Sequence, residues 1–527
     1  MYWLRRGTIV LALLLVASFI AWFVPRVLDP TSHGPARRAR DSLWVSSSPY
    51  WIDRQLCRWL SLCGLHHLRR DPASLPNPNM SSVDDIDDEV WTELRKRYVK
   101  PRSWEDRSSE ESDAETAKRQ DKKRNIFQRR RILKDIPDYV LKHAPLVHLY
   151  SGEQFWPSDI REHVQHMEVV VDDELVNITD EKLTLDNLHH LNKFKGVVTL
   201  HSLEDVETRP PWLHSHENVP KPFDDDGDDN DNSEISNGGP PAGGERTTWF
   251  DVDKDTPLHR ISDPRPRSSQ RPRSRSGQPR LQRRGHKPDA NGYSRAPAVL
   301  IIVDKGSGIV DAFWFFFYSY NLGQTVLGIR FGNHVGDWEH SMVRFENGIP
   351  KGIYFSEHEG GQAYAWEAVE KRGERPVIYS AVGSHAMYAT PGDHPYVLPF
   401  KMLKDVSDKG PLWDPALNNY AYHYNYKLGK HTEMDEESVD EDGNKQPPSL
   451  IPAATNPHAP TAWFHFDGYW GDRLYTLADY RQWRLFGQYH YVTGPTGPKY
   501  KQLARSKVCQ RSQCRILYKL DPKGTWY

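Results

Sequence analysis

One stretch of the sequence, residues 331–361, restricts the possible folds more than any other. It reads FGNHVGDWEHSMVRFENGIPKGIYFSEHEGG, with the apolar runs MVRF and IYF on either side of Asn347-Gly348. Asn-Gly tolerates the positive φ angles of tight hairpin turns, although Pro350 makes a longer loop equally plausible. The stretch therefore predicts a β-hairpin whose strands carry an unusual concentration of carboxylate and imidazole side chains.

The pairing of these two strands decides which polar side chains can meet. With an even loop length, residues opposite each other lie on one face of the hairpin. Asp337 and Glu339 are then expected on the face of His358, whereas His340 lies on the other face with Glu357. An odd loop length or a bulge would undo this assignment. We therefore expect Asp337, Glu339 and His358 to converge.

The rest of the C-terminal half is also typical of β structure. Residues 299–303 and 310–320 (VDAFWFFFYSY) are apolar runs rich in β-branched and aromatic residues, typical of strands buried on both faces. Residues 376–388 supply a further strand and a glycine turn, and residues 479–487 (DYRQWRLFG) are expected to be helical. Strands that recur at short intervals with turn signals favour a mainly β fold over alternating βαβ units: an antiparallel β-sandwich or jelly-roll-like body with a few helices.

Low-complexity segments divide this body along the chain. Only 37% of the 527 residues are hydrophobic, but 18 Trp, 25 Tyr and 18 Phe are ample for a core where they cluster. We expect one β domain made of residues 137–205 and 297–500. Its predicted interruptions and flanks are a disordered acidic and Arg/Ser-rich insertion (206–296), a polar insertion (430–460), a mostly polar linker with short helices (25–136) and a C-terminal tail (501–527).

The charge pattern argues against a nucleic-acid-binding protein. The formal net charge is −2, whereas general affinity for nucleic acid requires a dominant basic field. The stretch SDPRPRSSQRPRSRSGQPRLQRRGHK (262–287) is more typical of a disordered segment than of an RNA-binding one. The acidic run DDDGDDNDN (224–232) lacks the register of an EF-hand loop. No nucleic-acid partner is therefore expected.

The N-terminal region carries an uncharged run at residues 8–24 (TIVLALLLVASFIAWFV), close to the shortest length that spans a bilayer. Bulky residues at its end and the lack of a small-x-small cleavage site favour an uncleaved transmembrane signal anchor over a cleaved signal peptide. We therefore expect a single-pass membrane protein. Arginines lie on both sides of the run, so charge alone does not assign the topology.

Two features favour a body in the endomembrane lumen. The sequence contains two glycosylation sequons, of which Asn177 is the candidate glycosylation site. The four cysteines fall into two close pairs, Cys57 with Cys63 and Cys509 with Cys514, neither of which has zinc-ligand spacing. We predict a disulfide between Cys509 and Cys514, with free thiols as the alternative.

Residues 48–68 (SPYWIDRQLCRWLSLCGLHHL) form an amphipathic island within the polar linker. Trp51, Leu56, Trp59 and Cys63 fall near helical spacing. The segment is expected to dock on the body or to lie on a membrane surface.

Four blocks of the sequence resemble a known family. They are APLVHLYSGEQFWPSDI (144–160), GDWEHSMVRFENGIPKGIYFSEHEGG (336–361), RPVIYSAVGSHAMYATPGDHPY (375–396) and GPTGPKY (494–500). In this order they resemble the vacuolar protein sorting-associated protein 62 family of fungi, whose domain also occurs in plant proteins. The resemblance implies a role in protein targeting to the vacuole and a location at the vacuolar or a related membrane of the endomembrane system. It implies no catalytic residues.

The polar side chains of the hairpin are candidate metal ligands. Asp337, Glu339 and His358, joined by His385 of the GSHAMY block, combine carboxylate oxygens with imidazole. This donor set suits zinc, manganese or calcium, so the expected cofactor is a divalent metal. The alternative is that these groups are structural residues, bonded to the backbone at the corners of a sandwich.

A second candidate site lies near the C-terminus. Trp463, His465, Asp467 and Trp470 are predicted to bind a ligand, with the indoles as a platform for a sugar, although packing is the simpler role for a tryptophan. The chain has no GxSxG elbow and no glycine-rich phosphate loop. We expect a membrane-anchored factor that binds protein cargo or a glycan. A metal-dependent hydrolase of the endomembrane lumen is the alternative, and the sequence leaves open whether the protein is an enzyme.

Overall fold

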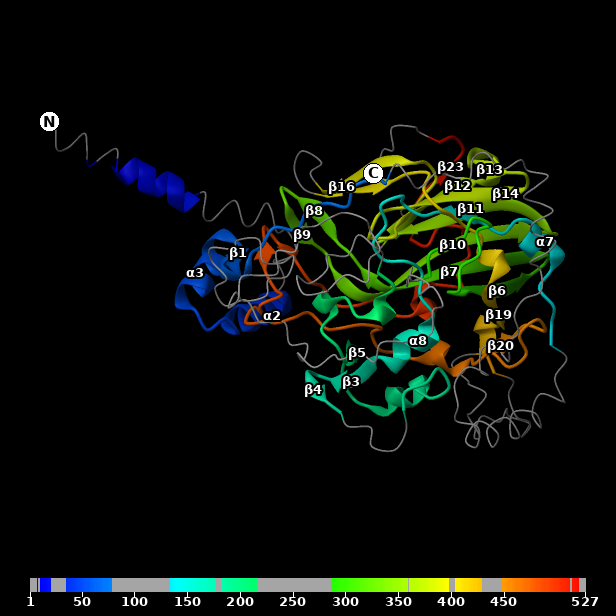
Figure 1. Cartoon of the computed structure of the whole chain (residues 1–527), viewed down its shortest axis with the longest axis horizontal. Helices are drawn as coiled ribbons and strands as arrows, with labels where there is room; N and C mark the ends of the chain where they lie inside the picture. The colour runs from blue at the N-terminus through cyan, green and yellow to red at the C-terminus, as the bar shows by residue number, and fades with distance from the viewer. Residues whose placement is uncertain are drawn as a thin grey trace, which may run out of the picture.

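The computed structural model describes residues 7, 10–19, 35–77, 133–176, 182–215, 286–358, 360–397, 403–428, 448–511 and 514–520. Within these ranges the protein is mainly β, with few and short helices (Figure 1). This confirms the predicted fold class at the level of a β-rich body. The candidate glycosylation site Asn177 and residues 216–285 of the predicted insertion lie outside the described residues.

An eight-stranded sheet forms the centre of the body, in the order β20-β19-β6-β7-β10-β11-β12-β23. Neighbouring strands are antiparallel, except that β19 runs parallel to β6 and β12 runs parallel to β23. The sheet is thus mixed rather than purely antiparallel. Its strands are β6 (Ala298–Gly306), β7 (Ile309–Asn321), β10 (His334–Glu346), β11 (Ile349–Glu357), β12 (Gly360–Ala365), β19 (Asn419–Tyr424), β20 (Leu450–Pro452) and β23 (Ile516–Leu517).

The composition of β7 explains why this sheet is covered on both faces. Phe313, Phe315 and Phe317 belong to one apolar core, and Trp314 and Phe316 belong to a second. Because successive side chains of a strand point to opposite faces, an uninterrupted apolar run produces a strand with two buried faces. The predicted double burial of this strand is confirmed.

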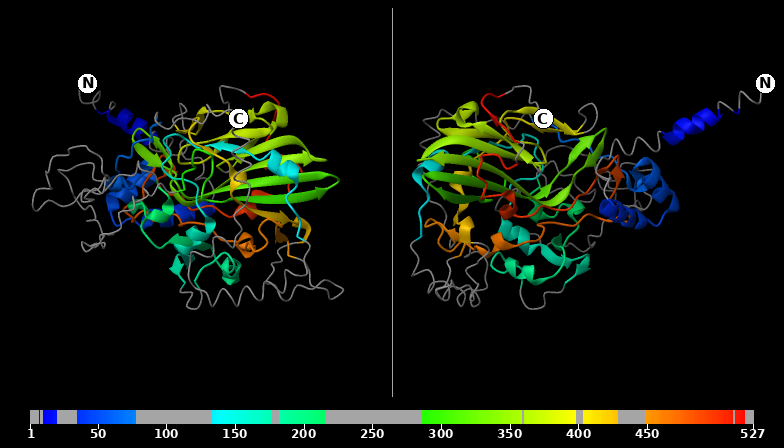
Figure 2. Two further views of the ribbon diagram at one scale, coloured as in Figure 1. Left: turned by 45° about the vertical axis from the view of Figure 1, so that its right-hand side comes forward. Right: turned by 180° about the vertical axis from the view of Figure 1, so that it is seen from behind.

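A smaller sheet packs across one face of the central sheet (Figure 2). The core between them contains Val147, Ile378 and Trp413 from the smaller sheet, packed with Leu300 and Phe316. β2 pairs in parallel with β14, so an N-terminal segment of the body folds together with a C-terminal one. The strands of this sheet are β13 (Lys371–Arg372), β14 (Arg375–Ser380), β2 (Leu146–His148) and β18 (Leu412–Trp413), with β15 (Met387–Tyr388) beside β14.

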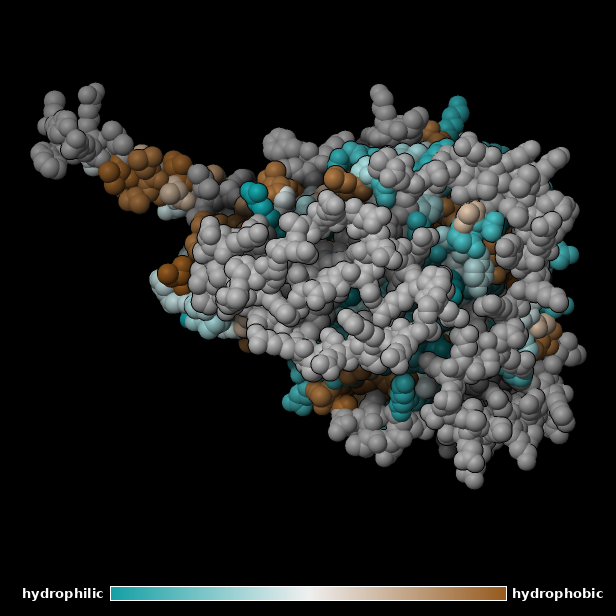
Figure 3. All heavy atoms as spheres, in the orientation of Figure 1, coloured by the Kyte–Doolittle hydropathy of each residue, from teal (hydrophilic) through white to brown (hydrophobic). Residues whose placement is uncertain are grey.

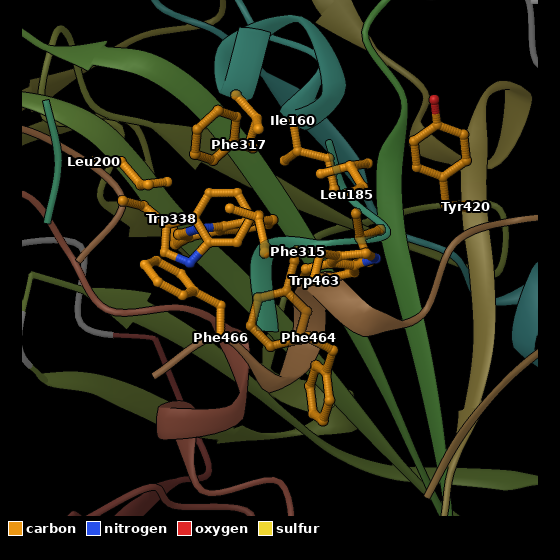
Figure 4. Close-up of a cluster of buried hydrophobic side chains, with 14 of the residues drawn as sticks. Ile160, Leu185, Leu200, Phe315, Phe317, Trp338, Tyr420, Trp463, Phe464 and Phe466 are labelled. Atoms are coloured by element: carbon orange, nitrogen blue, oxygen red, sulfur yellow. The ribbon is translucent and has the colours of Figure 1, made fainter. Parts of the chain in front are cut away.

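Short helices and a three-stranded sheet cover the other face. The core beneath them contains Ile160 and Leu200 together with the indoles of Trp338 and Trp463 (Figure 4). Asp159 caps the first of these helices by accepting a hydrogen bond from the Arg161 N–H at 2.9 Å. The elements are α8 (Ile160–Gln165), η4 (Leu188–Lys193), η6 (Pro211–Leu213), η11 (Ala462–His465), β3 (Met167–Val171), β4 (Glu174–Leu175) and β5 (Val198–Ser202).

Three further small sheets and the helix α7 also belong to the body. The helix expected at residues 479–487 is wrong, because this segment forms turns and β21, which pairs with β1 near the N-terminus. Tertiary pairing here overrides a locally helical pattern. These elements are β1 (Leu62–Cys63) with β21 (Arg484–Leu485) and β22 (Gln488–Tyr489), β8 (Gln324–Val326) with β9 (Ile329–Phe331), β16 (Gly392–Val397) with β17 (Leu403–Ser407), and α7 (Asp138–Lys142).

The helices α2 (Pro35–Ser46) and α3 (Trp51–Leu60) precede β1, which confirms a helix in the amphipathic island. A disulfide between Cys57 and Cys63 joins α3 to β1, and Trp51, Ile52 and Trp59 remain exposed on α3. The predicted anchor is described at residues 10–19, whose apolar side chains are exposed (Figure 3). No helix among the described residues has the length and apolar character needed to cross a bilayer.

The central hairpin has the predicted turn. Asn347 and Gly348 have φ angles of 52° and 79°, and Glu346 faces Ile349 across the turn. Asparagine and glycine are the residues that adopt two successive positive φ angles most readily. The Asn-Gly dipeptide therefore closes the hairpin as the sequence indicated.

The pairing farther along the hairpin is not the predicted one. The register shifts between Arg344 and Phe345, so that Ser341 pairs with Phe355. This β-bulge reverses the parity of the strands, and the prediction that Asp337 and Glu339 share a strand face with His358 is wrong. Pro350, which lacks an N–H, pairs with Phe345 next to the bulge, where proline is tolerated in a sheet.

Candidate functional site

A pocket of about 700 Å³ opens beside the first half of β10. Its lining includes His334, Asp337 and Glu339 from β10, together with His358 just after β11. Residues 492–496 and 500–501, which overlap the GPTGPKY block, also line it. Three of the predicted metal ligands therefore meet in one cavity in spite of the reversed strand parity, because His358 follows the end of its strand with a φ of 52°.

The strands β10 and β11 part where the pocket begins. Their last paired residues are Ser341 and Phe355. Beyond this pair the His340 N–H donates to the Ser356 hydroxyl at 2.7 Å, and that hydroxyl donates to the Glu339 carboxylate. One serine side chain thus bridges the two strands and orients Glu339.

A buried imidazole supports Asp337 from behind. His385 Nδ1 lies 2.9 Å from Asp337 Oδ2, and its ring stacks on Tyr318 with the centroids 3.6 Å apart. Burial lowers the pKa of His385, but the hydrogen bond to Asp337 and the charge of Glu153 raise it above its usual value. His385 is fully buried and does not line the pocket, so its place is behind Asp337.

His358 is paired with a buried carboxylate. Its Nε2 lies 2.7 Å from Asp405 Oδ2, and Asp405 also accepts hydrogen bonds from the hydroxyls of Ser384 and Tyr388 at 2.7 Å. Burial lowers the pKa of His358, but the charge of Asp405 and the hydrogen bond to it raise the pKa to about 9. His358 is therefore a cation at neutral pH. Sequence analysis missed Asp405, because no local motif marks it.

Two glutamates near the pocket differ in their surroundings. Burial, and then the charge of Asp337, raise the pKa of Glu339 to about 8. Glu357 is buried, and neither of its carboxylate oxygens has a hydrogen-bond partner among the described residues. Burial and the charge of Asp405 raise its pKa well above the usual range. With a pKa of about 8, Glu339 is the one of the two whose titration lies within about one pH unit of neutrality.

His334 is a pocket residue that sequence analysis missed. Its Nδ1 lies 2.6 Å from the Gly336 carbonyl, which leaves Nε2 as the nitrogen able to bind an ion. Burial lowers the pKa of His334, in spite of the charge of Asp337, so the ring is neutral at pH 7. The signal that could have revealed it is its place in the NHVGDWE motif beside Asp337 and Glu339.

The four predicted metal ligands do not form a compact ligand group. Within the part of the chain that the structure describes, one group of three His, Asp, Glu or Cys residues has its ligand atoms all within 4.8 Å, and it consists of Glu162, His214 and His286. His358 and His385 are instead each bonded to a carboxylate. A cation in the pocket would therefore be held by fewer protein atoms and more water.

The second predicted site supports a wall of the pocket. Asp467 accepts a hydrogen bond from the Tyr500 hydroxyl at 2.7 Å and pairs with Lys499. The backbone N–H of Trp470 donates to the Pro495 carbonyl at 2.8 Å. These contacts hold the loop that ends in η12 (Pro498–Lys501) against the body.

The two tryptophans of this second site lie in the core. Trp463 and Trp470 are 1% and 0% exposed, and Trp463 stacks on Trp338 with the centroids 5.9 Å apart (Figure 4). His465 is buried as well, with Nε2 3.3 Å from the Ser449 hydroxyl. The structure thus places these aromatic residues as packing rather than as an exposed platform, whereas Asp467 acts on the pocket through Tyr500.

Both cysteine pairs are disulfides. Cys509 is linked to Cys514, and Cys57 is linked to Cys63. The first of these bonds lies close to Gln510 and Arg511, which line the pocket.

The chain is similar to a family of proteins that are named for vacuolar protein sorting. The family model described as Vacuolar protein sorting-associated protein 62 matches residues 306–397. TDA6, a Saccharomyces cerevisiae protein named for vacuolar protein sorting, is 35% identical over 410 residues, covering 71% of this chain and 68% of the relative. Vacuolar protein sorting-associated protein 62 of the same yeast is 33% identical over 396 residues, covering 72% and 68%.

Solved structures give weaker likenesses. Necrosis and Ethylene inducing Protein 2 from the causal agent of cocoa's Witches Broom disease is 19% identical, covering 18% of this chain and 46% of that chain, with a TM-score of 0.15. NLPPya in complex with mannosamine is 18% identical, covering 18% and 45%, with a TM-score of 0.14. At these TM-scores the likeness supports no argument about fold or ligand.

Proposed function

The chain belongs to the vacuolar protein sorting-associated protein 62 family, and from this premise we propose that it takes part in delivering proteins to the vacuole. Its β body acts there by binding a ligand in the pocket beside β10. Two neighbouring carboxylates in a cavity of about 700 Å³ are the observation that carries this proposal. A pocket of this size suits a small ligand or one side group of a larger one.

The pocket binds its ligand through a divalent cation. Asp337 and Glu339 supply carboxylate oxygens, and the neutral imidazole of His334 lines the same pocket, where it can hydrogen-bond to water on the ion. Calcium fits best, because it accepts irregular oxygen-rich sites completed by water, whereas zinc requires a compact set of ligand atoms. His385 and His358, which the sequence placed among the ligands, instead orient Asp337 and the pocket wall through their carboxylate partners.

The ligand proposed for this cation is a glycan, carried by a cargo protein. Sugar hydroxyls can replace water on a bound calcium ion, and Tyr469, Tyr489 and Tyr500 supply aromatic lining around the cavity. Lys501 and Arg511 lie on the same lining and donate hydrogen bonds to hydroxyl or carboxylate oxygens. Aromatic and basic groups in the same cavity as a bound cation are suited to recognising a polar ligand.

The experiment is isothermal titration of calcium into the full-length protein. We expect one binding event that is lost in Asp337→Ala and retained in Asp393→Ala, an exposed acidic residue paired with Lys404 outside the pocket lining. A calcium-loaded sample is then applied to a glycan array with and without EDTA. Calcium binding that survives in Asp337→Ala would refute the site, and EDTA-insensitive glycan capture would refute the role of the cation.

A metal-dependent hydrolase of the endomembrane lumen is the second candidate, and one observation favours it. The pKa of Glu339, about 8, lies close to neutral pH, where a general base is most effective. The test is hydrolysis of chromogenic aryl glycosides in the presence of calcium. Turnover by the unmodified protein that disappears in Glu339→Gln would support the hydrolase, and its absence from both proteins would remove it.

Membrane attachment is proposed for the N-terminal region. Residues 8–24 insert into the bilayer, and α3 lies at its surface with the exposed side chains of Trp51, Ile52 and Trp59. Indole rings favour the interface between lipid and water. Alkaline carbonate extraction tests the anchor, which predicts that the full-length protein stays in the pellet. A deletion of residues 1–24 that pellets equally well would contradict it.

A further inference from the structure

Three residues from separate parts of the sequence meet beside α8 and η6. Glu162 lies in α8, His214 follows η6, and His286 is the first described residue after position 215. His214 Nε2 lies 2.8 Å from Glu162 Oε2, and the two imidazoles stack with centroids 3.6 Å apart. One ligand atom from each residue lies within 4.8 Å of the other two.

The backbone on both sides of this cluster is held in place. The His214 carbonyl accepts a hydrogen bond from the Trp156 N–H at 3.1 Å. The His286 carbonyl accepts one from the hydroxyl of Ser294, a buried residue, at 2.7 Å. The two imidazoles therefore meet because their backbones are anchored separately to the body.

One nitrogen of the cluster is open for metal binding. The His286 Nδ1 atom is buried and has no hydrogen-bond partner among the described residues.

We propose that Glu162, His214 and His286 bind a zinc ion, with water in the fourth position. Two imidazoles and one carboxylate are a donor set that zinc uses in proteins, at about 2.1 Å from the metal. An ion there would accept the buried lone pair of His286 and replace the direct contact between His214 and Glu162. The ion would link His214, which precedes residues 216–285, to His286, which follows them. None of the three proposed ligands lines the pocket beside β10.

The experiment measures zinc on the full-length protein after EDTA treatment and dialysis. Titration with zinc chloride, read by calorimetry and by elemental analysis after gel filtration, is expected to give about one equivalent per chain. Because loss of even an outer partner of a zinc ligand lowers affinity 10–100-fold, His286→Ala and Glu162→Gln are expected to weaken binding by at least about 100-fold.

Matched controls separate this site from the pocket. His166→Ala removes a neighbouring imidazole that stacks on Trp212, and Glu339→Gln removes a pocket carboxylate; both variants should keep the zinc. Glu162 lies partly at the surface, so its glutamine variant keeps the test valid if His286→Ala does not fold. No stoichiometric zinc on the unmodified protein, or zinc retained by Glu162→Gln, would overturn the proposal. Zinc lost only from Glu339→Gln would assign it to the pocket instead.

Discussion

The pH dependence of calcium binding is the most direct consequence of the proposed pocket. A carboxylic acid must lose its proton before it can bind a cation, so calcium competes with the proton on Glu339. Burial and the charge of Asp337 raise the pKa of Glu339 to about 8. Affinity should therefore rise with pH, because deprotonation costs less free energy as the pH approaches this pKa.

The size of the effect follows from that pKa. The apparent dissociation constant is the intrinsic one multiplied by one plus the ratio of protonated to ionised Glu339. With a pKa of about 8, that factor is about 100 at pH 6 and about 2 at pH 8, so calcium should bind roughly 50-fold more weakly at pH 6. About one proton should leave the protein for each calcium bound near pH 6.

Calorimetry at pH 6, 7 and 8, in pairs of buffers with different ionisation enthalpies, measures both the affinity and the released protons. Glu339→Gln should weaken binding and abolish the pH dependence. Glu357→Gln is the matched control, because this nearby buried glutamate does not line the pocket. An affinity that stays constant from pH 6 to pH 8 would refute the reasoning, and so would loss of the dependence in Glu357→Gln.

Three stability predictions follow from buried contacts, each measured by urea unfolding. The Asp414 carboxylate accepts hydrogen bonds from Arg375 Nη1 and Nη2 at 2.6 and 2.5 Å, so Asp414→Ala leaves this buried cation unpaired. The substitution should lower the free energy of unfolding by about 3–5 kcal/mol. A loss below about 1 kcal/mol would show that the pair contributes little to stability. Trp463→Ala should cost about 3–5 kcal/mol, because the indole is 1% exposed, and a near-neutral effect would return this residue to a binding role. Residue 336 has a φ of 69°, and an added Cβ would lie 2.2 Å from the Trp470 carbonyl oxygen. Gly336→Ala should therefore lower the free energy of unfolding by at least about 1–2 kcal/mol and also weaken calcium binding. Unchanged stability would contradict this close approach.

Much of the fold was predictable because the signals are local. The run VDAFWFFFYSY produces a strand with two buried faces, and Asn347-Gly348 produces the turn that follows β10. The amphipathic island at residues 48–68 contains α3. In each case the information lies in residues close together in the sequence, through strand alternation, helical spacing or turn geometry.

The candidate site was predictable only in part. Asp337 and Glu339 stand out because they interrupt an apolar strand, and they do line the pocket. The local sequence does not show that His358 pairs with Asp405, or that His385 lies behind Asp337. Asp405 comes from β17 and His385 from the connection between β14 and β15. Their effect on the pKa of each group depends on burial that no local pattern reports.

By itself, the sequence determined which segments become strands, where the central hairpin turns and which family the chain resembles. The tertiary structure decided the rest. A one-residue bulge beside Pro350 reversed the faces of the hairpin. Trp463, a candidate ligand platform, is buried in the core, and the fold places His214 against His286 although they are distant in the sequence. The physical reason is that backbone geometry depends on neighbouring residues, whereas burial, charge and side-chain contacts depend on residues that meet only after the chain has folded.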